Sequence, residues 1–191
     1  MADGFRTTCA SVFLTLVWSA WACGNQAAQG GVGRRFPSER TTYVDEMTGA
    51  EVTMLTTSPA RDDKIYQTHP NWTADRKHIV FTSDRTGPRQ YFAVSTQTGV
   101  ITQLTEDGGP GNACLSRTEN RMFYTSGREI WDLDIDAVLR QGPDAADLPC
   151  RRKVAELPPD TELSGTLTVD SDGKTMYLGV QRGDSWALLA L

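Results

Sequence analysis

Short apolar runs alternate with clusters of Gly, Asp, Asn and Pro from about residue 41 onward; Ile79–Phe81 and Met122–Tyr124 are two of these runs. Runs of a few apolar residues between turn-forming residues are typical of β-strands, whereas a helix repeats its apolar positions every three or four residues. Only a brief stretch, residues 134–140, has a helical pattern. The sequence therefore predicts an all-β fold with one short helix.

One block of sequence recurs along the chain. Residues 72–83 (WTADRKHIVFTS) align without gaps with residues 115–126 (LSRTENRMFYTS), and a third copy covers residues 169–178 (VDSDGKTMYL). Each copy reads as a strand, a tight polar turn and an apolar strand. In the third copy the turn contains Asp172-Gly173, and glycine readily adopts the positive φ that such turns favour.

Further strands follow each copy. The first copy is followed by predicted strands at 91–94 and 101–104, the second by strands at 129–134 and 153–155, and the third by a strand at 185–189. Four strands in about 40–50 residues is the period of a β-propeller blade. We therefore predict a partial β-propeller of four-stranded antiparallel blades, with about three blades plus an N-terminal hairpin.

The two ends of this unit are predicted to be incomplete. Residues 48–56 (TGAEVTMLT) resemble residues 98–105 (TGVITQLT), so the hairpin at 43–55 corresponds to the third and fourth strands of a blade that lacks its first two. The last blade stops after its third strand. We expect a truncated chain whose missing C-terminal half would close the ring; the alternative is a second copy that pairs through the open edges.

The N-terminal segment has the layout of a secretory signal. Residues 9–18 (CASVFLTLVW) are almost entirely apolar, and Ala20-Trp21-Ala22 supplies a small-residue cleavage pattern before Cys23. This predicts a signal peptide over residues 1–22 and an exported protein. Lipid attachment at Cys23, which would anchor the chain to a bacterial envelope, and release into the periplasm or the medium both fit; an uncleaved buried helix is a third interpretation.

The composition of the next segment differs again. Residues 23–40 are rich in Gly, Ala, Gln and Ser, which predicts a flexible tether, and the compact part is expected to cover residues 41–191. Export would permit a disulfide between Cys114 and Cys150, but their spacing does not require one. The net charge is −5 and the basic residues are scattered. We therefore expect no nucleic-acid partner, and membrane contact only through an N-terminal lipid.

Three short stretches together resemble a known family. The hairpin at 43–56, Ile65-Tyr66-Gln67 and Gln103-Leu104-Thr105-Glu106 resemble the N-terminal half of the oligogalacturonate lyases, a polysaccharide lyase family, and secondarily TolB-like β-propellers. The resemblance implies a seven-bladed propeller that degrades pectin by β-elimination on oligogalacturonate. It also implies a divalent metal, usually manganese, held by His and Gln in later blades. No catalytic or metal-binding residue of this chain is therefore assigned.

The stretch that enters the first full blade holds the candidate binding residues. Arg61, Lys64, Tyr66, Gln67 and His69 are expected on the face where propellers bind ligands, with His69 on the inner strand beside the central channel. They would contact oligogalacturonate or another acidic glycan; the alternative is a solvated loop with a hydrogen-bonded channel histidine. The sequence around Tyr66-Gln67 departs from that of the lyases, which have His-Arg before this pair.

Other conspicuous residues are predicted to be structural. His78 is expected to face solvent, Trp72 and Trp131 to pack within blades, and residues 170–173 to form a turn rather than a calcium site. Two functions remain in view. The first is the N-terminal part of an exported lyase-like propeller, inactive in isolation; the second is a non-catalytic TolB-like module that binds protein or glycan in the cell envelope.

Overall fold

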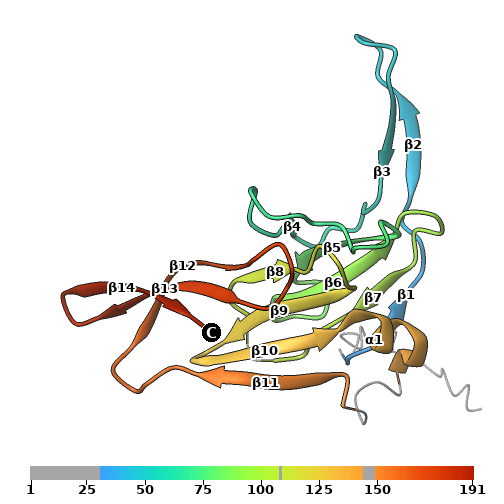
Figure 1. The fold of residues 1–191 in the computed structure, drawn as a ribbon. Helices are drawn as coiled ribbons and strands as arrows, with labels where there is room; N and C mark the ends of the chain where they lie inside the picture. Colours follow the sequence, from blue (N-terminus) through green and yellow to red (C-terminus); the bar gives the residue numbers. More distant parts are fainter. Residues whose placement is uncertain (1–30, 108, 144–148) are drawn as a thin grey trace, which may run out of the picture.

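The computed structural model describes residues 31–107, 109–143 and 149–191, and these residues form antiparallel sheets with one short helix (Figure 1). The first sheet has the strand order β1-β7-β6-β5-β4. Its strands, in chain order, are β1 (Arg35–Phe36), β4 (Asp62–Lys64), β5 (His78–Ser83), β6 (Gln90–Ser95) and β7 (Ile101–Gln103). This sheet is the first blade.

Two more blades follow. The second has the order β11-β10-β9-β8, and the third has the order β12-β13-β14. The second blade contains β8 (Ala113–Leu115), β9 (Arg121–Ser126), β10 (Glu129–Asp134) and β11 (Arg151–Glu156). The third contains β12 (Glu162–Val169), β13 (Met176–Arg182) and β14 (Ser185–Ala190). The predicted all-β, partial-propeller architecture is confirmed.

The pleat of the strands explains how these blades stack. Successive side chains in a strand point to opposite faces of the sheet. In β9, Met122 and Tyr124 therefore join the cluster shared with the first blade, whereas Phe123 between them joins the cluster shared with the third. The same alternation in β5 sends Val80 toward the second blade and Phe81 toward a separate cluster with Phe92. Each interface between blades is thus a hydrophobic core.

The predicted helix is confirmed between β10 and β11. Helix α1 (Ile135–Gln141) begins after Asp134, whose carboxylate accepts a hydrogen bond from the backbone N–H of Ala137 at 2.9 Å. This is the N-cap arrangement that satisfies an otherwise unpaired backbone donor. Ile135 and Val138 are buried, so the helix covers the cluster between the first two blades.

The predicted tether ends earlier than residue 40. Arg35 and Phe36 form β1, which pairs with Thr102 and Ile101 of β7 and adds a fifth strand to the first blade. Phe36 stacks edge-to-face on Phe92 with 6.0 Å between ring centroids. The prediction of a tether up to residue 40 failed because a strand of two residues is too short to show an alternation of apolar and polar positions. The proposed signal peptide and Cys23 lie outside the described residues.

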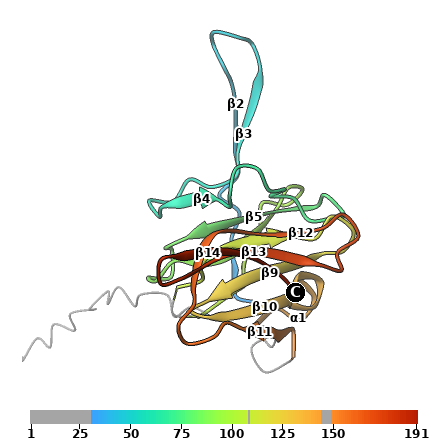
Figure 2. The ribbon, with the colours of Figure 1, turned by 60° about the vertical axis from the view of Figure 1, so that its left-hand side comes forward.

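The predicted N-terminal hairpin consists of β2 (Thr41–Val44) and β3 (Glu51–Met54), which form a two-stranded sheet of their own. It projects from the stacked blades (Figure 2). Its base is fixed by Glu39, whose carboxylate accepts hydrogen bonds from the backbone N–H groups of Thr57 and Ser58 and pairs with Arg85 at 2.8 Å. The orientation of the hairpin is therefore set by charged contacts at its base.

Two further predictions concern the cysteines and the membrane. Cys114 and Cys150 are both buried and both free, and they belong to different hydrophobic clusters, so the structure has no disulfide between them. Within the described ranges, no helix has the length and apolar character that crossing a bilayer requires.

Candidate functional site

A pocket of about 480 Å³ lies where the inner edge of the first blade meets the connection to the second. Four of the five candidate binding residues from the sequence line it: Arg61, Lys64, Tyr66 and Gln67. The remaining lining residues come from β4 to β6 and from the connection between the blades: Asp63, Ile65, Thr82, Arg89, Tyr91, Pro110, Gly111, Asn112 and Ala113. The structure therefore brings these four residues together, and their role in binding stays a prediction.

The pocket wall is formed by an interruption of the inner strand. β4 ends at Lys64, and the backbone returns to the sheet only at Asn71, whose carbonyl accepts a hydrogen bond from Val80 N–H at 2.7 Å. Trp72 then forms an isolated bridge with Ile79. Pro70 stands immediately before this return and has no N–H to donate to a ladder. The intervening residues bulge from the blade and expose Tyr66 and Gln67.

The predicted position of His69 on the inner strand is wrong, since it lies in this bulge. Its ring Nδ1 is 3.3 Å from the carbonyl oxygen of Ala113 in β8, so it connects the bulge to the second blade. The ring also contacts Tyr66 edge-to-face, with 5.6 Å between centroids. His69 does not line the pocket, and its contacts hold Tyr66 at the pocket wall.

The charges in the pocket are dominated by cations. Asp63 accepts from Arg61 Nε at 3.1 Å and from Arg89 Nη2 at 3.0 Å, so one carboxylate is shared by two guanidinium groups. Lys64 is exposed, and its ammonium group has no hydrogen bond or ion pair in the described part of the chain. Three cations therefore face one anion in a partly enclosed space. Such a pocket favours an anionic ligand, because Asp63 is the one carboxylate among the residues that line it.

Sequence reasoning missed the residues contributed by the neighbouring turn and connection. Arg89 donates to Thr82 Oγ1 from Nε at 2.9 Å, which orients its guanidinium toward Asp63. Tyr91 donates from its hydroxyl to the carbonyl of Gly111 and thereby fixes the connection between the blades. Burial raises the pKa of Tyr91, so this hydroxyl stays protonated. The only available signal for Arg89 was its place in the turn between two predicted strands.

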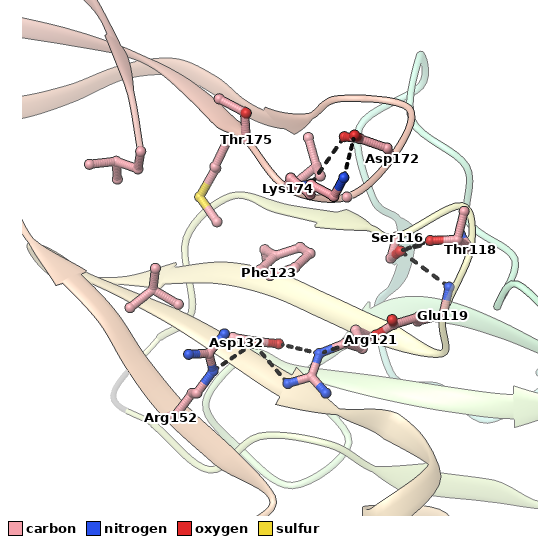
Figure 3. A pocket seen from close by; sticks show the side chains of 15 residues that line it. Ser116, Thr118, Glu119, Arg121, Phe123, Asp132, Arg152, Asp172, Lys174 and Thr175 are labelled. Atoms are coloured by element: carbon pink, nitrogen blue, oxygen red, sulfur yellow. Dashed lines mark hydrogen bonds and ion pairs between the residues drawn. The ribbon is translucent and has the colours of Figure 1, made fainter.

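A second pocket, also about 480 Å³, lies between the second and third blades (Figure 3). Its central feature is Asp132, 1% exposed, which accepts hydrogen bonds from Arg121 at 2.8 and 2.7 Å and from Arg152 at 3.0 Å. The hydrogen bond from Arg121 to Asp132 raises the pKa of the guanidinium. Lys174 is likewise paired with Asp172. These cations therefore have partners, and the contacts of Asp132 join β9, β10 and β11 within the second blade.

The prediction that His78 faces solvent is wrong. Its ring is partly buried, and its Nδ1 is buried without a hydrogen-bond partner among the described residues. Desolvation lowers the pKa of His78, although Asp75 and Asp136 partly oppose this. A histidine at the start of β5 is therefore kept neutral and belongs to the blade rather than to a binding surface.

The comparisons with known proteins find likeness in structure. No family model and no curated protein matches the chain. An oligogalacturonate lyase in complex with manganese is 26% identical, with a TM-score of 0.70, and the match covers 83% of this chain and 40% of the lyase. An oligogalacturonate lyase from Vibrio parahaemolyticus is 22% identical, with a TM-score of 0.69, and the match covers 81% of this chain and 39% of that lyase. TolB from Acinetobacter baumannii is 17% identical, with a TM-score of 0.53, and the match covers 81% of this chain and 38% of TolB.

The described residues do not fit a manganese site. They contain no group of three or more His, Cys, Asp or Glu side chains that could hold a metal ion. His69 contacts the carbonyl oxygen of Ala113, and the Nδ1 of His78 is buried. Asp63 and Asp132 are each shared by two arginines. No step of a reaction is assigned to a metal in this part of the fold.

The likeness to these structures agrees with the features described above: antiparallel blades of five, four and three strands, an N-terminal hairpin and hydrophobic cores between neighbouring blades. The chain spans about two-fifths of the length of the lyases that it matches, 40% of one and 39% of the other. Its fold is that of a partial β-propeller that resembles the oligogalacturonate lyases and, less closely, TolB.

Proposed function

We propose that this chain supplies the first blades of an exported oligogalacturonate lyase-like protein, and that the pocket between its first two blades binds the carboxylates of an acidic oligosaccharide. The single observation that supports this most is the excess of cations around the exposed Tyr66 in a fold with a TM-score of 0.70 to a lyase. The signal-like residues 1–22 support export.

The chemistry of the pocket fits uronate recognition. A galacturonate unit carries a carboxylate and an apolar ring face. Lys64 and Arg61 offer donors for the carboxylate, and charge-assisted hydrogen bonds of this kind are among the strongest in proteins. Tyr66, 45% exposed, offers an aromatic face that His69 holds in place. Together these groups would bind and orient an acidic sugar without reacting with it.

We expect no β-elimination by this chain alone. The reaction removes the proton next to the uronate carboxylate, which requires a base within hydrogen-bond reach and a neutralised carboxylate. The pocket supplies cations, but its carboxylate Asp63 is already shared by two arginines, and His69 lies outside it. The proposed role of these blades is therefore substrate binding.

Titration calorimetry with trigalacturonate tests the binding proposal. We expect affinity to fall with increasing salt and to fall about tenfold or more in the double variant Arg61→Ala/Lys64→Ala, since two charged contacts are lost. Lys174→Ala is the matched control, because this lysine is exposed but lies in the third blade beside Asp172. Fully methyl-esterified trigalacturonate should not bind. Equal affinities for the double variant and the wild type would contradict the proposal.

A TolB-like module that binds a protein in the envelope is the second candidate. It is favoured by the likeness to TolB and by the projecting hairpin, which exposes Tyr43, Val44 and Met54 at 49%, 62% and 42%. Exposed apolar side chains on a two-stranded sheet suit a protein contact. Failure of every galacturonate probe to bind at low salt would favour this candidate over the lyase-like one.

A further inference from the structure

A third cavity, a hollow of about 420 Å³, lies at the other end of β8 from the pocket that Arg61, Lys64 and Arg89 line, which we call the cationic pocket. Ala113 at the start of β8 lines the pocket, whereas Ser116 and Arg117, just after the end of β8, line the hollow. Trp72 and Arg76 of the first blade form its other side. The two cavities thus share an interface between blades but are separated by the length of a strand.

Trp72 is the main apolar surface of this hollow. Its side chain is 48% exposed, although the sequence repeat aligns it with Leu115, which is 3% exposed and part of the core between the blades. The prediction that Trp72 packs within a blade is therefore wrong. The isolated bridge with Ile79 ties its backbone to β5 and so fixes the place of the exposed indole on the first blade. An exposed tryptophan in a rigid setting is typical of a binding surface.

Two arginines flank this indole. Arg76 and Arg117 are exposed, and among the described residues neither guanidinium group has a hydrogen bond or ion pair. The nearby Asp75 is already bonded to the Thr73 hydroxyl at 2.6 Å and to the backbone N–H of Lys77 at 3.0 Å. In a protein of net charge −5, two unpaired guanidinium groups in one hollow provide a local site for an anion.

The backbone of Arg76 is held in an unfavourable conformation. Its φ is 61°, in the left-handed region, and it is the one non-glycine residue with positive φ in the described ranges. The equivalent turn position in the third blade is Gly173, with φ 75°. Glycine would adopt this conformation without the steric cost that arginine incurs. The strained residue thus places a guanidinium in the hollow, at a position where the third copy of the repeat has no side chain.

We propose that this hollow binds a carboxylate-bearing pyranose, with the C–H face of the sugar on Trp72 and its carboxylate between Arg76 and Arg117. Guanidinium groups match the planar, two-oxygen geometry of a carboxylate, and the indole covers an apolar ring face. This is a second acidic-sugar site, distinct from the cationic pocket.

A nucleotide fits the hollow less well. A base is recognised by hydrogen bonds to its edge, but the hydroxyls that line the hollow are already engaged. Thr73 Oγ1 bonds Asp75, and Ser116 Oγ lies within hydrogen-bond distance of Thr118 Oγ1 and accepts from the backbone N–H of Glu119. A pyranose with a carboxylate requires only the indole face and the two arginines that are free to bind it.

Intrinsic tryptophan fluorescence of the full chain tests this site, with digalacturonate as the probe. We expect a saturable change that disappears in Trp72→Ala and persists in the control Trp186→Ala, which removes another exposed tryptophan, 67% exposed in β14. Arg117→Ala should weaken the response about tenfold or more, and galactose, which lacks the carboxylate, should produce none. Thermal melts of each variant would confirm that the fold is retained.

Two further measurements distinguish binding at this site from binding in the cationic pocket and from binding of other ligands. The double variant Arg61→Ala/Lys64→Ala should leave the Trp72-dependent fluorescence response to digalacturonate unchanged. This expectation holds even if calorimetry shows that the cationic pocket does not bind trigalacturonate. The inference is overturned if digalacturonate produces no response that depends on Trp72. It is also overturned if Arg117→Ala binds like the wild type, or if adenosine monophosphate or galactose produces an equal response.

Discussion

Replacing Arg85 by methionine removes a buried cation from the base of the hairpin. The Arg85 side chain is 5% exposed and pairs with Glu39 at 2.8 Å and with Asp62 at 3.1 Å, two carboxylates whose side chains are 18% and 15% exposed. Its guanidinium also lies over the rings of Phe36, Phe81 and Phe92, at 5.7, 5.5 and 5.4 Å from their centroids. Methionine would retain the apolar contacts and lose the charge.

The expected cost follows from what the substitution leaves behind. Removing one partner of a buried ion pair costs about 3–5 kcal/mol, because the remaining charge is buried without compensation. Here two carboxylates are left, so we expect the free energy of unfolding to fall by about 4 kcal/mol or more. A typical domain is stable by about 5–15 kcal/mol, so the variant would be close to the limit of folding.

Urea unfolding followed by circular dichroism measures this effect. With a slope of about 2 kcal/mol per M, the midpoint should fall by about 2 M. The triple variant Arg85→Met/Glu39→Gln/Asp62→Asn is the matched control, since it leaves no buried charge and should recover part of the loss. A loss below about 1 kcal/mol in the single variant would refute the assignment of Arg85 as a buried, paired cation.

The same variant has a defined pH dependence. Burial on its own raises the pKa of Glu39, but the N–H groups of Thr57 and Ser58 and the Arg85 guanidinium outweigh it, so the pKa lies below the ordinary value of 4.5. The stability that Glu39 contributes is therefore present above that ordinary value and is lost as the pH falls through the lowered pKa. Without Arg85 this pKa should rise, so the deficit of the variant should shrink as the pH is lowered below about 4. A deficit that is constant with pH would contradict this account.

Two further predictions test single side chains. Burial raises the pKa of the Cys114 thiol to about 12, and the residue is 2% exposed. Cys114 should therefore not react with a disulfide reagent at neutral pH until the protein unfolds. Peptide mapping by mass spectrometry would detect the modified cysteine, and labelling of Cys114 in the native protein would contradict this prediction. Arg76→Gly should stabilise the protein by about 1 kcal/mol, because glycine adopts a φ of 61° without strain. The same substitution should weaken digalacturonate binding at Trp72. Thermal melts measure the change in stability, and a lower melting temperature would show that the turn is not strained.

The blades could be predicted because the repeat preserves the alternation of buried positions. Val80 and Phe123 occupy equivalent places in the repeat, on the central strands β5 and β9, and each faces the hydrophobic cluster that its blade shares with the next blade. Each strand of the repeat thus encodes its two faces locally. The same reasoning located β14 and the short helix α1, since their boundaries depend on local turns and on the N-cap residue Asp134.

The features that depend on a neighbouring blade were not predictable in this way. Trp72 and Leu115 are equivalent in the repeat, yet only Leu115 is covered by other elements of the fold. Arg89 reaches the cationic pocket because Asp63 and Thr82 orient it, a contact between segments that no motif marks. His69 was misplaced because the repeat does not extend to the bulge, although Pro70 was a local signal that the strand is interrupted there.

The pairing of β1 with β7 has a consequence for the order of folding. β5, β6 and β7 are joined by short turns and can pair as soon as each is available, whereas Arg35 must find Thr102 across the whole hairpin and most of the first blade. Contacts that close long loops carry a larger entropic cost and form later. Although β1 is synthesised before the rest of the blade, it should dock last. Until it does, the outer edge of β7 is open to pairing with another chain.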